Sequence, residues 1–366
     1  MNIKKYLSNL PGWHTKRKIV VLESDDWGSL RAPSGDGFEL MQKKNLPLGD
    51  LEGIRFNQYD DLASQDDLEL LFEVLEKFRD KNDRTTVMTA LSLVANPDFE
   101  KIEANNFEKY YYKSLPKSLE EFNKSSSWPL WKEGFDKGLF IPEFHGREHL
   151  NVPSWMRDLK DSNSLASIGF KHKFWGFRQK SSVVSYQAAF DLEHYQDIET
   201  HKQTLKDGLS LFENLHGRKA RFFVPPNGPF NNSLESITAS EGISYISTSK
   251  IHKESLGGGK TKKHFRYLGK KNKENQLYLT RNAIFEPSNP RKSDWVDSCL
   301  KEINSAFQFN KPATISSHRV NYIGARDTKN RDYSLRELKR LLNQIQKKWP
   351  EVEFMSSSDL GQLMAN

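Results

Sequence analysis

The sequence has little cysteine and no long apolar run. Its single cysteine, Cys299, excludes an internal disulfide. No stretch approaches the roughly 20 apolar residues that a membrane-spanning helix needs, and the mean hydropathy is −0.74. The opening residues MNIKKYLSNLPGWHTKRK contain basic side chains but no apolar run of signal-peptide length. We therefore expect a cytoplasmic protein without a transmembrane segment.

Neither sign of charge dominates the chain. The formal net charge is +7, but 55 basic residues are interleaved with 48 acidic ones. This interleaving names no anionic partner and does not favour a nucleic-acid-binding protein. The denser stretch KTKKHFRYLGKKNK, residues 260–273, could contact phosphate or an acidic glycan. A solvated hairpin or loop is the commoner meaning of such a run.

What is present suits a globular α/β protein. With 366 residues, 36% of them hydrophobic, the chain can bury one large core or two moderate ones. Short β-branched or aromatic runs alternate with amphipathic helical segments, which predicts a mainly parallel sheet. Strands are expected at residues 18–22, 86–93, 140–144, 220–224, 243–247, 277–284, 313–317 and 352–355. Helices are expected at residues 64–81, with Ser64 as N-cap, 198–215, 232–240, 294–307 and 334–348.

Three regions do not fit this alternation. Residues 28–61 are rich in glycine and proline, residues 96–137 are polar and aromatic, and residues 151–182 carry several aromatic side chains. Long irregular stretches inside a compact domain are usually functional excursions. We expect residues 1–366 to form a single domain, with these three regions as insertions on one face.

Polar residues follow several of the predicted strands. Asp25 and Asp26 come directly after the first strand. Two adjacent carboxylates resist joint ionisation unless a cation or a base function separates their roles. An Asp pair taken alone is more often a solvated turn. The carboxyl ends of strands are, however, where α/β folds place their reactive groups.

The segment after the third strand contains His145 and His149. A spacing of four places both imidazoles on one face of a helical turn, where they can share a metal ion. Unlike the zinc metalloprotease pattern, no glutamate directly follows the first histidine. A third ligand must come from elsewhere, and an aspartate is the natural candidate.

Two further strand ends carry unusual residues. The run VPPNG, residues 224–228, is a rigid turn in which Asn227 and Gly228 could aim amide hydrogens into a site. The run ISSH ends in His318, which could deliver a proton at neutral pH. A plain turn and a structural histidine are the alternatives.

Taken in order, these four segments resemble the polysaccharide deacetylase family, also called the NodB homology domain. Its motifs are an Asp-Asp turn, a His-x-x-x-His, a proline turn and a strand-end histidine. The likeness spans about residues 18–360. It implies a distorted (β/α) barrel of about seven strands, with helical and loop insertions.

The resemblance also implies a role for each matched residue. The first aspartate of the family's pair is the general base and the second binds the metal, so Asp25 would be the base and Asp26 a ligand. His145 and His149 match the two histidine ligands. His318 matches the catalytic acid.

Further roles follow from the remaining motifs. The proline turn implies the backbone amide of Asn227 as an oxyanion donor. Asp294-Trp295 matches the family's Asp-Trp motif, whose tryptophan would pack against the acid histidine. The turn arginine that normally holds the base is Val224 here, so Asp25 needs another cation. The candidates are Arg147, Arg281 and Arg319.

The long gap between Asp26 and His145 predicts an inserted cap that shapes the substrate pocket. We assign substrate binding to Pro226, Asn227, Trp27, Arg147, Arg319 and Trp295. Sugar faces could stack on Trp27, Trp131, Trp155 and Trp175, although aromatic residues this numerous are more often core.

The resemblance implies a metal-dependent hydrolase acting on a non-peptide C–N bond. The expected substrate is an N-acetylated sugar, whether free, nucleotide-linked or lipid-linked. Zinc suits the mixed nitrogen and oxygen ligands, and cobalt, nickel, manganese or iron would also fit. Two alternatives stay open: hydrolysis of another amide or ester, and a catalytically inactive glycan-binding relative, which the loss of the turn arginine at Val224 keeps in play.

Overall fold

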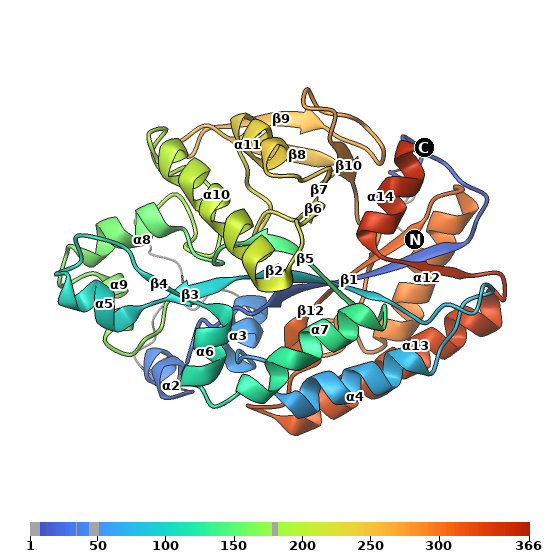
Figure 1. The fold of residues 1–366 in the computed structure, drawn as a ribbon, viewed down its shortest axis with the longest axis horizontal. Coiled ribbons are helices and arrows are strands. Elements are labelled where there is room, and N and C mark those ends of the chain that lie inside the picture. The colour runs from blue at the N-terminus through green and yellow to red at the C-terminus, as the bar shows by residue number, and fades with distance from the viewer. Residues whose placement is uncertain (1–7, 34, 44–50, 178–181) are drawn as a thin grey trace.

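The computed structural model describes residues 8–33, 35–43, 51–177 and 182–366. Its main sheet follows the order β10-β7-β6-β5-β2-β1-β12-β11, with β13 paired to β1, and every pairing is parallel. The strands are β1 (Ile19–Trp27), β2 (Met88–Leu93), β5 (Phe140–Gly146), β6 (Phe222–Phe223), β7 (Tyr245–Ser247), β10 (Leu277–Leu279), β11 (Ala283–Ile284), β12 (Ala313–His318) and β13 (Glu353–Met355). The eight strands of this path curl into a half-barrel with helices around it (Figure 1), which confirms the predicted distorted (β/α) barrel.

One predicted strand proves to be two. Residues 277–284 form β10, which pairs with β7, and β11, which pairs with β12 near the opposite end of the path. The segment therefore bridges the two edges of the curled sheet. Between the two strands, Arg281 binds carboxylates of β1. The other seven predicted strands each overlap an observed strand, and β1, β5 and β12 extend beyond the predicted ends.

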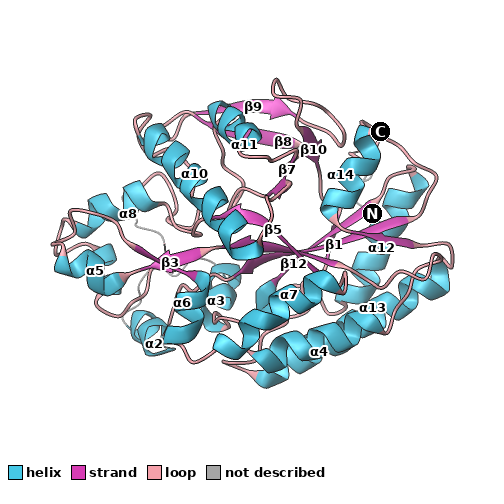
Figure 2. Cartoon of the chain, in the orientation of Figure 1, coloured by secondary structure: helices cyan, strands magenta, loops and turns pink. Residues whose placement is uncertain are grey.

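Helices surround the strands (Figure 2). They include α4 (Gln65–Glu76), α10 (Asp197–His216), α11 (Glu235–Ser240), α12 (Trp295–Gln308), α13 (Thr328–Lys348) and α14 (Ser357–Ala365). Ser64 caps α4 in a reciprocal capping box with Asp67, as predicted in part from the sequence. Helix α13 begins at Thr328 rather than at residue 334, because Asp327 caps it. No helix in the described ranges is long and apolar enough to cross a membrane.

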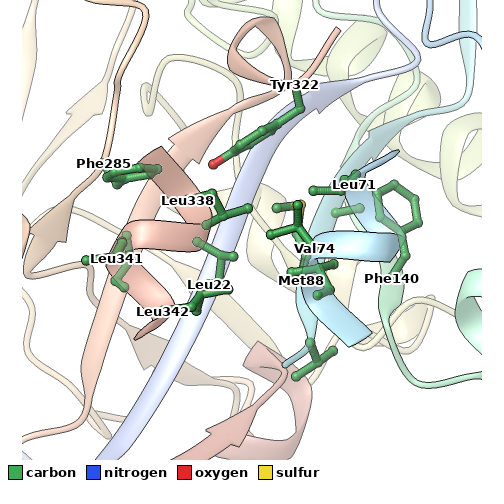
Figure 3. Packing of buried hydrophobic residues seen from close by; sticks show 14 of the residues in the cluster. Leu22, Leu71, Val74, Met88, Phe140, Phe285, Tyr322, Leu338, Leu341 and Leu342 are labelled. Carbon is green, nitrogen blue, oxygen red and sulfur yellow. The ribbon is translucent and has the colours of Figure 1, made fainter. Parts of the chain in front are cut away.

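The largest hydrophobic cluster lies between the sheet and helices α4 and α13. Figure 3 labels Leu22, Leu71, Val74, Met88, Phe140, Phe285, Tyr322, Leu338, Leu341 and Leu342 of this cluster. Burial of one such large side chain stabilises the fold by about 1.5–3 kcal/mol. This packing fixes the strands from one side, so it also fixes where their polar carboxyl ends lie.

The three predicted insertions supply a separate cluster. Its buried members include Phe38, Phe99, Trp155, Phe170 and Trp175. The elements of these regions are α2 (Gly35–Lys43), α3 (Leu51–Gln58), β3 (Ala95–Pro97), α5 (Phe99–Ala104), β4 (Tyr112–Ser114), α6 (Leu115–Glu121), α7 (Trp128–Asp136), α8 (Val152–Leu159) and α9 (Leu165–Phe170). In Figure 1, α2, α5, α8 and α9 gather at one end of the molecule. The single-domain organisation stays a prediction.

The basic stretch at residues 260–273 begins in a hairpin. β8 (Ile251–Ser255) and β9 (Thr261–Phe265) pair antiparallel, apart from the main sheet. Lys262 and Lys263 of β9 are exposed. A solvated hairpin, which is the commoner meaning of such a run, accounts for this part of the stretch.

Candidate metal centre

A cleft of about 440 Å³ opens at the carboxyl ends of the strands. All four strand ends that the sequence singles out contribute to its wall. The lining residues are Asp25, Asp26, Arg31, Phe56, His145, His149, Gln187, Val224, Pro225, Asn227, Gly228, Ser247, Thr248, Ser249, Lys250, Arg281, Asn282, Ala283, Ile284, Ser316 and His318. Segments distant in the chain thus converge on one place.

Asp26, His145 and His149 meet at one wall of the cleft. Asp26 Oδ1 lies 3.3 Å from His145 Nε2 and 3.2 Å from His149 Nε2. The three ligand atoms all lie within 4.8 Å of one another, and all three residues are buried. Ligands about 2.0–2.1 Å from a tetrahedral ion stand about 3.3–3.5 Å apart. The two distances to Asp26 match that spacing.

The protonation of the histidines suits a cation. His145 Nδ1 lies 2.7 Å from the backbone carbonyl oxygen of Val224, which makes Nδ1 the donor and leaves a lone pair on Nε2. That buried Nε2 has no hydrogen-bond partner among the described residues. Burial lowers the pKa of His149 despite the nearby Asp26 carboxylate, which favours a neutral ring. A carboxylate oxygen facing two such rings is well matched to a bound metal ion.

Arg31 completes the surroundings of Asp26. Its Nη2 lies 2.7 Å from Asp26 Oδ2, the oxygen turned away from the histidines. Burial raises the pKa of the Asp26 carboxyl, but the Arg31 guanidinium, the largest opposing cause, helps to hold the pKa well below its usual range. Asp26 therefore stays ionised. Sequence reasoning missed Arg31, whose only signal is its place in the first insertion.

Asp25 is held by Arg281, one of the three cations that the sequence left open. Arg281 Nη1 and Nη2 lie 2.7 Å and 2.6 Å from the two oxygens of Asp25, and Nε lies 2.5 Å from Glu23 Oε2. Burial raises the pKa of Asp25, but Arg281 outweighs burial and lowers it. The missing turn arginine at Val224 thus has a counterpart on the segment that bridges the sheet edges.

His318 lies on the other side of Asp25. Its Nε2 is 3.9 Å from Asp25 Oδ2, and its Nδ1 is 2.5 Å from Glu286 Oε1. Burial lowers the pKa of the imidazole, but Glu286, followed by Asp25, outweighs burial and raises it. The sequence motifs name no carboxylate partner for His318. Glu286 directly follows Phe285 at the end of a predicted strand, and that position was the available signal.

The proline turn contributes backbone to the cleft. Asn227 has a φ of 55° and Gly228 a φ of 91°. Within the described part of the chain, the Asn227 backbone N–H makes no hydrogen bond, so it is available to a ligand. Pro225 lines the cleft, but Pro226 does not. The assignment of Pro226 to substrate contact is therefore not supported.

The two tryptophans assigned to substrate binding lie elsewhere. Trp27 is fully buried in the main core, where its Nε1 donates to Ser24 Oγ and its ring meets Phe140 edge-on. Trp295 is also buried and donates to the carbonyl oxygen of Asn289. Its predicted contact with His318 is made instead by Phe56, whose ring centroid lies 4.8 Å from that of His318. Both assignments were wrong because local sequence does not tell a core tryptophan from a cleft tryptophan.

Two arginine assignments also need correction. Arg147 makes two hydrogen bonds to Glu148 and one to Asp207, away from the cleft lining. Arg319 binds Asp60 at 2.8 Å and is buried. Neither guanidinium contacts Asp25 or lines the cleft. Both are structural ion pairs, and the predicted role in substrate binding does not hold.

Comparison with known proteins adds likenesses of fold only. No protein-family model matches the sequence, and no curated protein matches it significantly. Among solved structures, a putative polysaccharide deacetylase from Mycobacterium smegmatis is 11% identical, with coverage of 97% of this chain and 93% of that one and a TM-score of 0.47. An allantoinase is 10% identical over 96% and 91% of the two chains, with a TM-score of 0.46. A 4-alpha-glucanotransferase from Thermococcus litoralis is 11% identical over 94% of this chain and 40% of its own length, with a TM-score of 0.47.

These TM-scores are below 0.5, and the three names belong to different activities. The overlays therefore carry no argument about chemistry, which has to come from the side chains of the cleft. The chain is similar to these proteins in its parallel half-barrel fold alone.

Proposed function

We propose that this protein is a metal-dependent hydrolase that removes the acetyl group from an N-acetylated sugar. The observation that carries the proposal is the convergence of Asp26, His145 and His149, at distances that suit one ion, beside the pair Asp25 and His318. One carboxylate and two imidazoles leave coordination positions open, as catalytic sites require. A divalent ion held there would supply an activated water and polarise the acyl oxygen.

The two proton-transfer groups favour opposite protonation states, as acid and base roles require. Asp25 is kept ionised by Arg281, so it can accept a proton from the attacking water. Glu286 raises the pKa of His318 against the opposing effect of burial, which favours the protonated ring that can donate a proton to the departing amine. The backbone N–H of Asn227 can donate a hydrogen bond to the developing oxyanion.

The rest of the cleft combines apolar surface with several hydrogen-bonding side chains. Hydroxyl and amide side chains line it at Gln187, Ser247, Thr248, Ser249 and Asn282. The Ser249 hydroxyl and the Asn282 amide already bond main-chain groups of the protein. The remaining groups can exchange hydrogen bonds with sugar hydroxyls. Hydrolysis of another amide or of an ester is the second candidate, because the same groups would act on any acyl C–N or C–O bond that enters the cleft.

The test is acetate release by purified protein reloaded with zinc, cobalt or manganese. The substrates are N-acetyl-chitooligosaccharides, UDP-N-acetylglucosamine and, as a non-sugar ester, p-nitrophenyl acetate. We expect turnover of an N-acetyl sugar that falls on the order of 100-fold or more in Asp25→Asn and His318→Ala. Turnover of the ester alone would favour the second candidate. Bound metal without any turnover would contradict the proposed reaction and favour a glycan-binding protein.

A further inference from the structure

Helix α3 of the first insertion reaches the acid side of the cleft. Arg55 Nη1 lies 2.9 Å from Glu286 Oε2 and 2.6 Å from Ser288 Oγ. The next residue, Phe56, lines the cleft and packs its ring edge-on against His318. Arg55 and Glu286 are both buried, so their ion pair lies in a low-dielectric setting.

The same helix also reaches the metal side. The Phe56 ring is in cation–π contact with two guanidinium groups, with Arg55 Cζ at 4.5 Å and Arg31 Cζ at 5.3 Å from its centroid. Arg31 in turn donates to Asp26. An unbroken line of contacts therefore runs from Asp26 through Arg31, Phe56 and Arg55 to Glu286.

We propose that Arg55 and Phe56 are positioning residues, through which α3 holds the His318–Glu286 pair in fixed register with Asp26. This inference deepens the proposed function. Its kinetic test rests on the proposed function, because the test measures deacetylase turnover. Phe56 takes the place expected of Trp295 against the acid imidazole. Arg55 acts through Glu286, because a buried carboxylate without its guanidinium would move toward its remaining partners and carry His318 with it.

Arg55→Ala is the variant to test, with Arg266→Ala as its matched control. Arg266 is also buried, also lies 2.9 Å from a glutamate, Glu235, and also stacks on an aromatic ring, at 4.1 Å from Tyr278. It does not line the cleft. The two variants therefore remove comparable buried ion pairs, of which only that of Arg55 is linked to His318. Arg266 also donates to Asn232 and, at 3.3 Å, to Thr248 of the cleft wall.

With N-acetyl-chitooligosaccharides as substrate, we expect Arg55→Ala to lower kcat by about 10- to 100-fold without changing KM. Added guanidinium ion and the conservative variant Arg55→Lys should each restore part of kcat. Arg266→Ala should leave kcat unchanged. An unchanged kcat in Arg55→Ala, or an equal fall in Arg266→Ala, would overturn the inference.

If the protein shows no turnover, the proposed function is contradicted, but the positioning role of Arg55 can still be tested. The measurement is then hydrogen exchange of peptides that cover residues 284–288 and 316–321. Faster exchange confined to these peptides in Arg55→Ala, and absent there in Arg266→Ala, supports the positioning role. Unaltered exchange, or a rise spread over the whole chain, contradicts it.

Discussion

Asp26 has a backbone φ of 73°, which is uncommon for a residue other than glycine. The pairing of β1 with β2 shifts register between Ser24 and Trp27. In a regular strand, successive side chains point to opposite faces, so Asp25 and Asp26 would face apart. The irregularity allows both carboxylates to line one cleft. Backbone strain of this kind, on the order of 1–3 kcal/mol, is typical of a position under functional constraint.

At the scale of single residues, Arg281→Met should strongly destabilise the protein. It leaves the buried carboxylates of Glu23 and Asp25 without their shared cation. We expect the free energy of unfolding to fall by about 3–5 kcal/mol, as measured by urea denaturation. Lys301→Ala, which removes an exposed pair with Asp297, serves as control and should leave the free energy of unfolding nearly unchanged. Equal effects of the two changes would show that Arg281 does not hold the base.

At the scale of elements, β13 is tied to its surroundings through Glu353. Its carboxylate lies 2.6 Å from Arg17 Nη2, 3.1 Å from Lys81 Nζ and 3.3 Å from Arg84 Nη2. The Arg17 guanidinium, opposed by burial and helped by Lys81, lowers the pKa of Glu353 to about 2. Distant parts of the chain thus meet on one strand that pairs with β1.

The sign of the pH dependence follows from this lowered pKa. The stabilisation is fully present above the ordinary glutamate pKa of 4.5 and is lost as pH falls toward about 2. Glu353→Gln should cost about 1–3 kcal/mol at neutral pH, a value reduced because Arg17 and Lys81 are partly exposed. Unfolding free energies of both proteins at several pH values between neutrality and 3 test this. A difference that stays constant over that range would refute it.

The elements themselves were largely predictable. Residues 19–22 are apolar on both faces, and residues 140–144 are apolar apart from Glu143, as is typical of parallel strands buried under helices. The helix at residues 64–81 carries its own cap. The division of residues 277–284 was not predictable, because Arg281 interrupts the strand to reach carboxylates more than 250 residues away in the chain. Contacts between residues so far apart in the chain leave no pattern in the local sequence.

At the scale of the whole molecule, the order and spacing of the four motif segments were enough to predict that five residues share one site. These are Asp25, Asp26, His145, His149 and His318, which all line the cleft. The surrounding groups were not predictable in the same way. Arg31, Arg55 and Phe56 come from an insertion without a recognised motif. Trp27 and Trp295 were misplaced, because their burial depends on how distant segments pack.

The three insertions also link the packing of the whole molecule to its site. They share one hydrophobic cluster, and the first of them contributes both to that cluster and to the cleft, through Phe38 and Phe56 respectively. The packing of the inserted elements is therefore coupled to the geometry of the site. The predicted cap that shapes the pocket has a physical counterpart in α3.

The central claim is that one carboxylate and two imidazoles hold a divalent ion. The most direct test is the metal content of protein equilibrated with zinc and freed of excess, measured by mass spectrometry for the unaltered chain and for Asp26→Ala, His145→Ala and His149→Ala. We predict about one ion per unaltered chain and a loss of most binding in each variant. An unaltered chain that retains no more metal than the three variants would contradict the account.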